Sequence, residues 1–332
     1  MDRYDVEVQW LITEFCNFDC PYCWLQDAPK VNRFIGNKDI RKIIDGFNNQ
    51  GIRWLIHMTG GEPFFYPNFL QLCQELTKKH YISINTNLTH RDVLLFSEII
   101  NPERVEFLHT SLHITQRNRK EGFEGFIKNY KTFKKAGFNI FVSYLMYPAL
   151  FDRYKRDYAY FKSRGIILHP KVFWGDYFGI FDLKSIKKMR YISKLKPYFR
   201  KYYPDAYSAK QKKLFKDYAD KSVQDEISLY AKHPSEGSRT VDLALDKKWV
   251  DGLLSYKGKR CSAGRNVVRM EKDGEVYRCI DETQYYLGNM FTGRLKFLKE
   301  DLICNARICS CPYVGMRYIL QDENSSNEHA NN

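Results

Sequence analysis

The chain contains no run of about 18 uncharged apolar residues, the length that a membrane-spanning helix needs. Its first residues also lack the basic segment followed by an apolar segment that marks a secretion signal. Both absences argue against membrane insertion and export, so we expect a cytoplasmic protein without a membrane partner. The nine cysteines gather near the two ends of the chain and are not spread as pairs. In a reducing compartment this distribution favours metal or redox chemistry over disulfide bonds.

Positive charge is in excess and is unevenly distributed. The 53 Lys and Arg residues exceed the 39 Asp and Glu residues, for a net charge of +14. Fourteen Lys or Arg and only five Asp or Glu lie between Lys184 and Lys232. Such a run usually forms a solvated surface. The alternative is a site for an anionic partner, such as a phosphorylated, nucleotide-linked or nucleic-acid substrate.

A strand, a loop and a helix recur along the first 175 residues. Strand patterns cover residues 6–12, 54–58, 81–87, 105–113, 139–146 and 166–173, and helical patterns cover 40–50, 69–76, 93–100, 126–137 and 154–165. Such repeats predict a parallel sheet with its helices outside. In α/β folds of this kind, functional residues gather at the carboxyl ends of the strands.

The chain changes character twice after residue 175. Residues 176–256 are basic and rich in tyrosine, and a capping box at Ser208 and Gln211 indicates a helix, so we expect a helical connector. Within residues 257–318, an Asp-Gly turn joins two short strand patterns into a β-hairpin, and a helix is expected at 295–302. The polar tail, 319–332, has no apolar pattern and is expected to be disordered.

Two short motifs follow the first two predicted strands. Cys16, Cys20 and Cys23 lie within eight residues, and the turn Gly60-Gly61-Glu62-Pro63 ends the second strand. Three such thiols can hold three corners of an iron–sulfur cluster and leave one iron open to a further ligand. A zinc site is the weaker alternative, because it needs four ligands and no His or Cys occurs in the next thirty residues. Cys73 falls on an apolar helix face and is interpreted as a buried small hydrophobic residue.

Together, at these positions, the two motifs resemble those of the radical S-adenosylmethionine (radical SAM) superfamily. The resemblance covers residues 5–175. It implies a partial (β/α)6 TIM-like barrel and a 4Fe-4S cluster on the three cysteines, with the methionyl amino and carboxylate groups of S-adenosylmethionine on the open iron. The residues that the resemblance assigns to S-adenosylmethionine are Tyr22, Gly60, Gly61, Glu62, Pro63, Asn85, Asn87 and Ser111.

The second cysteine set carries a resemblance of its own. The spacing Cys261-x12-Gly274-x4-Cys279 is similar to the hairpin of the auxiliary-cluster modules called SPASM and twitch. Only three further cysteines follow, too few for two clusters. The resemblance therefore implies one auxiliary iron–sulfur cluster, of the 4Fe-4S type, within a small β-hairpin and helix module at residues 257–318. Its expected ligands are Cys261, Cys279, Cys309 and Cys311, with Cys304 as the alternative. A zinc ion on four thiolates would have the same spacing and stays open.

The resemblance also implies an activity. An external electron donor such as flavodoxin or ferredoxin would reduce the cluster, S-adenosylmethionine would be cleaved, and the resulting 5′-deoxyadenosyl radical would abstract hydrogen from a substrate. Whether oxidation, epimerisation or rearrangement follows is left open. His113, just past a strand end, is the best placed of the barrel histidines to act as an acid or base.

Two alternatives concern the substrate. Because the first strand begins within about six residues of Met1, we expect no leader-peptide-binding domain ahead of the barrel, and a small-molecule or carbohydrate-like substrate is favoured over a peptide or protein. A modifying enzyme of the RiPP or sulfatase type is the second hypothesis. Nucleic-acid binding with structural metal sites ranks last, since it leaves the turn at Gly60 to Pro63 without a role.

Overall fold

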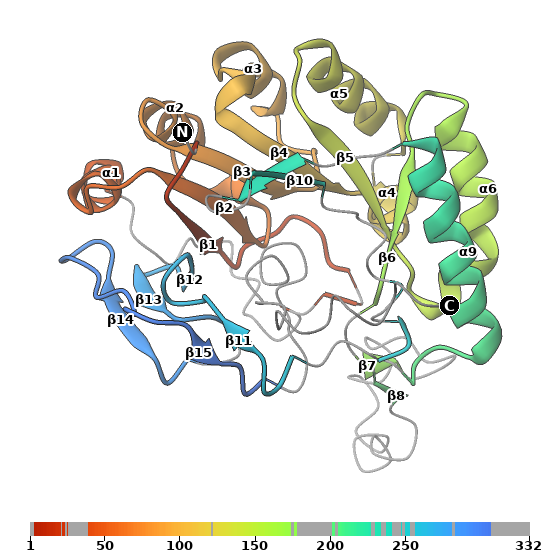
Figure 1. Ribbon diagram of the computed structural model, residues 1–332. Coiled ribbons are helices and arrows are strands. Elements are labelled where there is room, and N and C mark those ends of the chain that lie inside the picture. The colour runs from red at the N-terminus through yellow and green to blue at the C-terminus, as the bar shows by residue number, and fades with distance from the viewer. Residues whose placement is uncertain are drawn as a thin grey trace, which may run out of the picture.

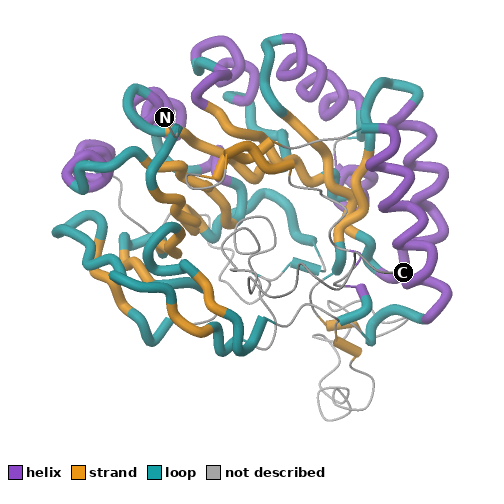
Figure 2. Tube along the Cα trace, viewed as in Figure 1, coloured by secondary structure: helices purple, strands orange, loops and turns teal. Residues whose placement is uncertain are grey.

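The computed structural model describes residues 3–20, 22–23, 25, 39–120, 122–173, 176–177, 201–202, 205–226, 230–233, 237–240, 247, 250–252, 256–280 and 283–306. Six parallel strands form a curved sheet with helices along its outer side (Figures 1 and 2). The strands are β1 (Val6–Thr13), β2 (Trp54–Gly60), β3 (Tyr81–Thr86), β4 (Val105–Ser111), β5 (Ile140–Leu145) and β6 (Leu168–Lys171). They pair in chain order, which confirms the predicted α/β fold class.

The helices between the strands cover the outer face of the sheet. The α-helices are α1 (Ile40–Asn49), α2 (Phe69–Thr77), α3 (Val93–Ile99), α4 (Ile114–Lys120), α5 (Glu124–Lys135) and α6 (Phe151–Lys162), and the short 3-10 helices are η1 (Pro63–Phe65), η2 (Pro102–Arg104) and η3 (Pro148–Leu150). Five of the six α-helices match predicted ones. Helix α4, which follows β4 directly, was not predicted because its seven residues contain little apolar spacing.

Alternation along the strands separates an apolar outer face from a polar inner face. On β1, Val8, Trp10 and Ile12 are completely buried, and Trp10 packs against Phe47 of α1 with 5.9 Å between the ring centroids. The inner face carries polar residues such as Glu7, which is also completely buried. The apolar face drives the sheet and helices together, while the polar face is left for the interior of the barrel.

The C-terminal hairpin extends the same sheet. Strands β12 (Val267–Met270) and β13 (Glu275–Tyr277) form the predicted antiparallel hairpin, and β14 (Tyr286–Asn289) pairs with β13. Strand β12 also pairs in parallel with β1, giving a sheet in the order β14-β13-β12-β1-β2-β3-β4-β5-β6. The hairpin was predicted, but its attachment to the barrel sheet was not.

The helix predicted at residues 295–302 is wrong. Its backbone N–H groups are used by distant partners: Leu295 donates to the Gln50 side chain (3.0 Å), and Leu298 donates to the Gly264 carbonyl (3.0 Å). The segment ends in β15 (Leu302–Ile303), which pairs with β11 (Arg260–Cys261). Hydrogen bonds to the rest of the module therefore outweigh the helical spacing of its leucines.

The described part of the connector contains one long helix. Helix α9 (Ala209–Asp225) begins with the predicted capping box of Ser208 and Gln211 and lies beside α6 (Figure 1). Its Asp225 accepts a hydrogen bond from Tyr158 of α6 (2.5 Å). The described part of the connector also contains two antiparallel strand pairs. Strand β7 (Asp176–Tyr177) pairs with β8 (Lys201–Tyr202), and β9 (Tyr230–His233) pairs with β10 (Gly237–Thr240).

Two of the predicted segments contain residues that the structure does not describe. Residues 178–200 of the expected helical connector and the tail at 319–332 lie outside the described residues. Within the described ranges, no helix has both the length and the apolar content needed to cross a bilayer.

Candidate functional site

The first cysteine set follows β1, at the carboxyl edge of the sheet. Burial raises the pKa of the Cys16 thiol to about 12, and it also raises the pKa values of Cys20 and Cys23. The negative charges of Cys16 and Cys23 raise the pKa of Cys20 further, so the three thiols lie within electrostatic range of one another. Neighbouring thiols that oppose each other's ionisation are unfavourable by themselves, and a bound cationic metal centre would favour the thiolates.

The spacing of these groups bears on the kind of metal. In the described part of the chain, no three His, Cys, Asp or Glu side chains come together closely enough to hold one metal ion. A single zinc ion needs its ligands around one point, whereas a cubic cluster holds each ligand at a separate corner. Three cysteines on one loop match the number of ligands that a cluster with one open iron needs, one fewer than a structural zinc site.

Amide side chains hold the cysteine loop in place. The Asn87 amide donates to the Asn17 side-chain oxygen (2.9 Å), and Asn17 donates to the Thr89 hydroxyl (2.9 Å). The Asn87 nitrogen lies 3.9 Å from the Cys16 sulfur. The segment that follows β3 therefore lies against the first cysteine, and Asn87 contacts the cysteine loop.

Helix α4 holds the other end of the loop. The Gln116 side chain accepts from the Asp19 N–H (3.1 Å) and donates to the Asp19 carbonyl (2.8 Å). Arg117 is only 1% exposed; it donates to the Leu112 carbonyl (2.6 Å) and to the Asn87 carbonyl. Its positive charge acts against the effect of burial on the pKa of Cys20. Sequence reasoning missed both residues, because the short helix that carries them shows little periodic signal.

The glycines of the second motif allow a close backbone contact. Gly61 donates to the Thr13 carbonyl and Glu62 to the Phe15 carbonyl, both at 2.7 Å. A Cβ on Gly61 would lie 2.0 Å from the Phe15 oxygen, and Gly60 has a φ of +139°. Only glycine permits this approach without displacing the chain. The motif is thereby fastened to the segment that leads into Cys16.

The Glu62 carboxylate ties the ends of two strands together. It is 1% exposed and accepts from the Thr86 hydroxyl (2.7 Å) and the Asn87 N–H (2.6 Å), both at the end of β3. Burial raises its pKa to about 7, and these hydrogen bonds act in the opposite direction. Pro63 follows as the first residue of the short helix η1.

His113 contacts the cysteine loop directly. Its Nδ1 atom lies 3.5 Å from the Cys20 sulfur and 3.4 Å from the Tyr22 hydroxyl, and its ring stacks on the Tyr22 ring with centroids 6.0 Å apart. Its backbone has a φ of +48°, which is unusual for a residue with a side chain. Burial lowers the pKa of His113 to about 3, so the ring is neutral near pH 7.

Two other predicted residues line the barrel interior, deeper than Asn87. Asn85 donates to the Thr59 hydroxyl (3.1 Å), and its side-chain oxygen lies 3.1 Å from Nδ1 of His109. Since that oxygen can only accept, Nδ1 of His109 carries the proton, and Nε2 accepts from the Ser143 hydroxyl (2.7 Å). Ser111 ends β4 and is paired in register with Ser143. These groups form a polar wall across β2 to β5.

The second cysteine set gathers in the C-terminal module. Cys261 and Cys304 belong to one small buried cluster, and Cys279 packs against it. Burial raises the pKa of Cys261 to about 11, and the charges of Cys304 and Cys279 raise it further. Cys304, expected only as an alternative ligand, therefore lies with the other two. Cys309 and Cys311 lie outside the described residues.

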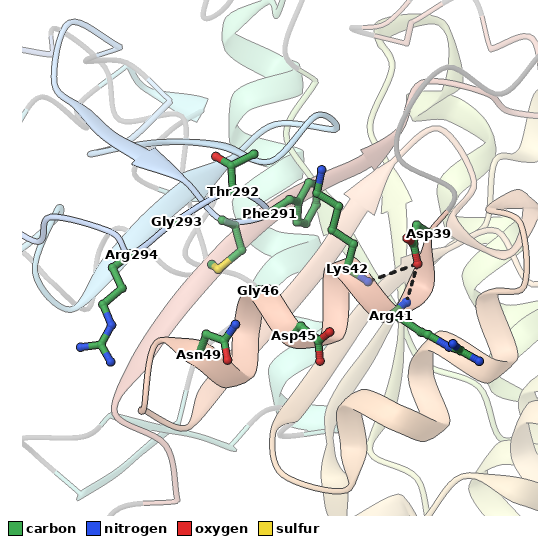
Figure 3. Close-up of a pocket in the computed structure, with 11 residues that line it drawn as sticks. Asp39, Arg41, Lys42, Asp45, Gly46, Asn49, Phe291, Thr292, Gly293 and Arg294 are labelled. Carbon is green, nitrogen blue, oxygen red and sulfur yellow. Dashed lines mark hydrogen bonds between the residues drawn. The ribbon is translucent and has the colours of Figure 1, made fainter.

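A cavity of about 600 Å³ opens elsewhere, between α1 and the turn after β14 (Figure 3). It contains none of the predicted site residues and no cysteine. The residues that line it are Asp39, Arg41, Lys42, Asp45, Gly46, Asn49, Met290, Phe291, Thr292, Gly293 and Arg294.

Known sequences are similar to part of this chain. The model of the Radical SAM superfamily matches residues 10–158, a range that includes the first cysteine set and the Gly60 turn. GTP 3′,8-cyclase of Ectopseudomonas mendocina (strain ymp) is 31% identical over 118 residues, which are 34% of this chain and 34% of that enzyme. The chain thus matches about a third of the length of this curated relative. The superfamily and the cyclases indicate an enzyme, as predicted.

Solved structures share the fold. The structure of native anSMEcpe with bound AdoMet has a TM-score of 0.55 and 16% identity, covering 88% of this chain and 79% of that chain. Streptococcus suis SuiB bound to S-adenosylmethionine has a TM-score of 0.54 and 16% identity, covering 95% of this chain and 68% of that chain. At these identities the likeness establishes the fold alone.

Proposed function

We propose that this chain, whose residues 10–158 form a radical SAM domain, binds a 4Fe-4S cluster on Cys16, Cys20 and Cys23 and S-adenosylmethionine beside the turn Gly60 to Pro63. When bound, these groups supply reductive cleavage of S-adenosylmethionine and a 5′-deoxyadenosyl radical that abstracts hydrogen from the substrate. The observation that carries the proposal is the direct fastening of the two motifs, through the 2.7 Å hydrogen bond from Glu62 N–H to the Phe15 carbonyl.

The chain's own residues would fix and shield the site. Gln116 and Arg117 of α4 and Asn17 and Asn87 hold the cysteine loop from two sides. Cys20 and Tyr22 are each 6% exposed, so the loop shields the Cys20 sulfur from water, whereas Cys16 and Cys23 are half-buried. Hydrogen bonding and solvent exposure set the potentials of such clusters. His113, whose Nδ1 atom lies 3.5 Å from the Cys20 sulfur, is placed to donate to that sulfur; we favour this role over general acid or base catalysis.

The proposal includes one auxiliary iron–sulfur cluster in the C-terminal module. Its support is the grouping of Cys261, Cys279 and Cys304 in one small cluster, in which the charges of Cys279 and Cys304 raise the pKa of Cys261. We therefore assign Cys304 as the third ligand, with the fourth from Cys309 or Cys311. A full second cluster would need more cysteines than the chain contains.

A small polar molecule is the proposed substrate class. Its support is the polar wall of Thr59, Asn85, His109 and Ser143, where hydrogen bonds run across four neighbouring strands. These side chains present polar atoms to the interior of the barrel, and a ligand with hydroxyl or charged groups could bind to them. The small-molecule name of the cyclase relatives agrees with this class. An external donor such as flavodoxin or ferredoxin would supply the electron.

The test is S-adenosylmethionine cleavage by the reconstituted protein. With iron, sulfide and dithionite under anaerobic conditions, the chain should form 5′-deoxyadenosine. The Cys16→Ala, Cys20→Ala, Cys23→Ala variant should form none, whereas Cys73→Ala, which removes a buried thiol from α2, should retain activity. Equal product from the triple variant and the unaltered chain, or none from either, would overturn the proposed function.

A further inference from the structure

The cysteines of the C-terminal module lie on segments held in two different ways. Strands β11 and β15 pair, with Cys261 opposite Leu302. The backbone of Cys304 donates to the Lys259 carbonyl and accepts from the Gly258 N–H, both at 2.8 Å. Backbone pairing therefore fixes Cys261 and Cys304 relative to each other. Cys279 follows β13, which belongs to the large sheet, so it needs another connection to them.

The Arg278 side chain provides that connection. It precedes Cys279 directly and is 1% exposed. Its Nε atom donates to the Ala263 carbonyl (3.1 Å), two residues after Cys261, and its Nη2 atom donates to the Leu302 carbonyl (3.0 Å), two residues before Cys304. The planar guanidinium has donors in a fixed fork, so both bonds restrain the same group.

The surroundings make room for this side chain. Gly264 has a φ of +92°, and a Cβ there would lie 3.1 Å from Cγ of Arg278 and 2.6 Å from a Leu298 methyl. A larger residue at this position would press on the arginine stem. Arg278 is anchored at its other end by its N–H, which donates to the Tyr285 carbonyl (3.0 Å).

Charge adds a second effect. A guanidinium stays protonated in proteins, and a positive charge close to buried thiolates offsets part of their mutual repulsion. The two hydrogen bonds that fix the guanidinium also place this charge between the segments that carry the cysteines.

We infer that Arg278 is the positioning residue of the auxiliary site: its side chain joins the three cysteine-bearing segments and supplies a fixed positive charge beside their thiolates. The inference rests on the auxiliary cluster of the proposed function. Arg278 itself ligates nothing and acts through Cys261, Cys279 and Cys304.

The experiment isolates the auxiliary site. The full-length Cys16→Ala, Cys20→Ala, Cys23→Ala protein retains only the C-terminal cysteines as cluster ligands, so iron and sulfide bound after anaerobic reconstitution report on that site. Adding Arg278→Lys keeps the charge but loses the fork, and we expect a ten-fold to hundred-fold weaker hold on iron against a chelator, the usual cost of losing an outer-shell partner. Arg269→Lys is the matched control, since Arg269 is 4% exposed in the same module and binds Glu271 instead.

A second readout separates positioning from folding. Arg278→Gln removes the charge, and any cluster it retains should have a more negative reduction potential by EPR titration than the cluster of Arg278→Lys. Circular dichroism of the apoproteins checks that the variants fold. Unchanged iron retention and potential in both Arg278 variants, or equal losses in Arg269→Lys, would overturn the inference. If the Cys16→Ala, Cys20→Ala, Cys23→Ala protein binds no iron, the proposed auxiliary cluster is wrong and so is the role of Arg278. The first cluster is tested separately, by 5′-deoxyadenosine formation by the unaltered chain.

Discussion

The two cysteine sets are built differently. Cys16, Cys20 and Cys23 share one loop, which side-chain amides of Asn17, Asn87 and Gln116 hold in place. Cys261 and Cys304 lie far apart in the sequence and meet through backbone pairing of β11 and β15. The first set can be found from spacing along the chain, whereas the second depends on strand pairing.

Both sets nevertheless include a buried arginine used in the same way. Arg117 and Arg278 are each 1% exposed, each donates to two backbone carbonyls on separate segments, and each lowers the pKa of one cysteine against the effect of burial. In both sets, therefore, neighbouring cysteines lie near a buried arginine that supplies a fixed positive charge.

The largest expected effect separates the two sets by function. Cys20→Ala should abolish 5′-deoxyadenosine formation, because no other protein ligand replaces this corner of the first cluster. Cys304→Ala should remove iron from the auxiliary site and leave S-adenosylmethionine cleavage measurable. Iron content and product formation, determined on the same preparations, check both. If Cys304→Ala abolished cleavage as completely as Cys20→Ala, the two sites would not be separable.

Gly61→Ala should damage the first site through packing alone. The added methyl would lie 2.0 Å from the Phe15 oxygen, so the segment leading into Cys16 must move. We expect a loss of about 1–3 kcal/mol in the free energy of unfolding, together with loss of the first cluster. Denaturant unfolding of the apoprotein measures the first quantity.

Gly125→Ala is the matched control for that substitution. A Cβ at Gly125 in α5 meets nothing within 4 Å, and alanine should stabilise the helix by roughly 0.5–1 kcal/mol relative to glycine. Two glycine variants with the same effect on stability and on iron would contradict the packing argument.

Replacing each buried arginine in turn tests whether it acts on one cysteine set only. Arg117→Leu leaves the buried Leu112 and Asn87 carbonyls without these donors, and we expect a loss of roughly 2 kcal/mol in stability and about ten-fold weaker iron binding at the first site only. Arg278→Leu should have the converse selectivity. Each arginine substitution is combined with the loss of one cysteine set, and the iron bound after reconstitution is then measured at the set that remains. An effect of either arginine on both sets would show that the sites are coupled.

The smallest effect concerns pH and lies away from both sets. Burial lowers the pKa of His80 to about 4, and its Nδ1 accepts from the Trp54 N–H (3.3 Å), so the folded state keeps the neutral ring. The unfolded state binds a proton below about pH 6.5, so stability is retained above that pH and falls as the pH drops toward 4, by roughly 3 kcal/mol at most. His80→Gln should flatten the dependence between pH 6.5 and 4 in apoprotein unfolding, and an unchanged slope would contradict this assignment.

Local sequence was sufficient for the repeated units and for the first site. Strand and helix patterns recur within about 30 residues, so they predicted β1 to β6, five of the outer helices and the capping box of α9. The close spacing of Cys16, Cys20 and Cys23 and the turn at Gly60 carried the resemblance to the radical SAM superfamily, because these features depend on neighbouring residues and on the order of strand ends.

The tertiary structure decided the features that depend on contacts between residues far apart in the sequence. The pairing of β12 with β1, the absence of a helix at residues 295–302 and the grouping of Cys304 with Cys261 all follow from hydrogen bonds between remote segments. The buried positions of Arg117 and Arg278 follow from the carbonyl groups that their folded surroundings present. Sequence by itself determined the spacing of Cys16, Cys20 and Cys23 and the position of the turn at Gly60, and only the packed molecule determined which contacts hold these segments in place. The physical reason is that a buried charge is stabilised by partners that the chain brings together on folding.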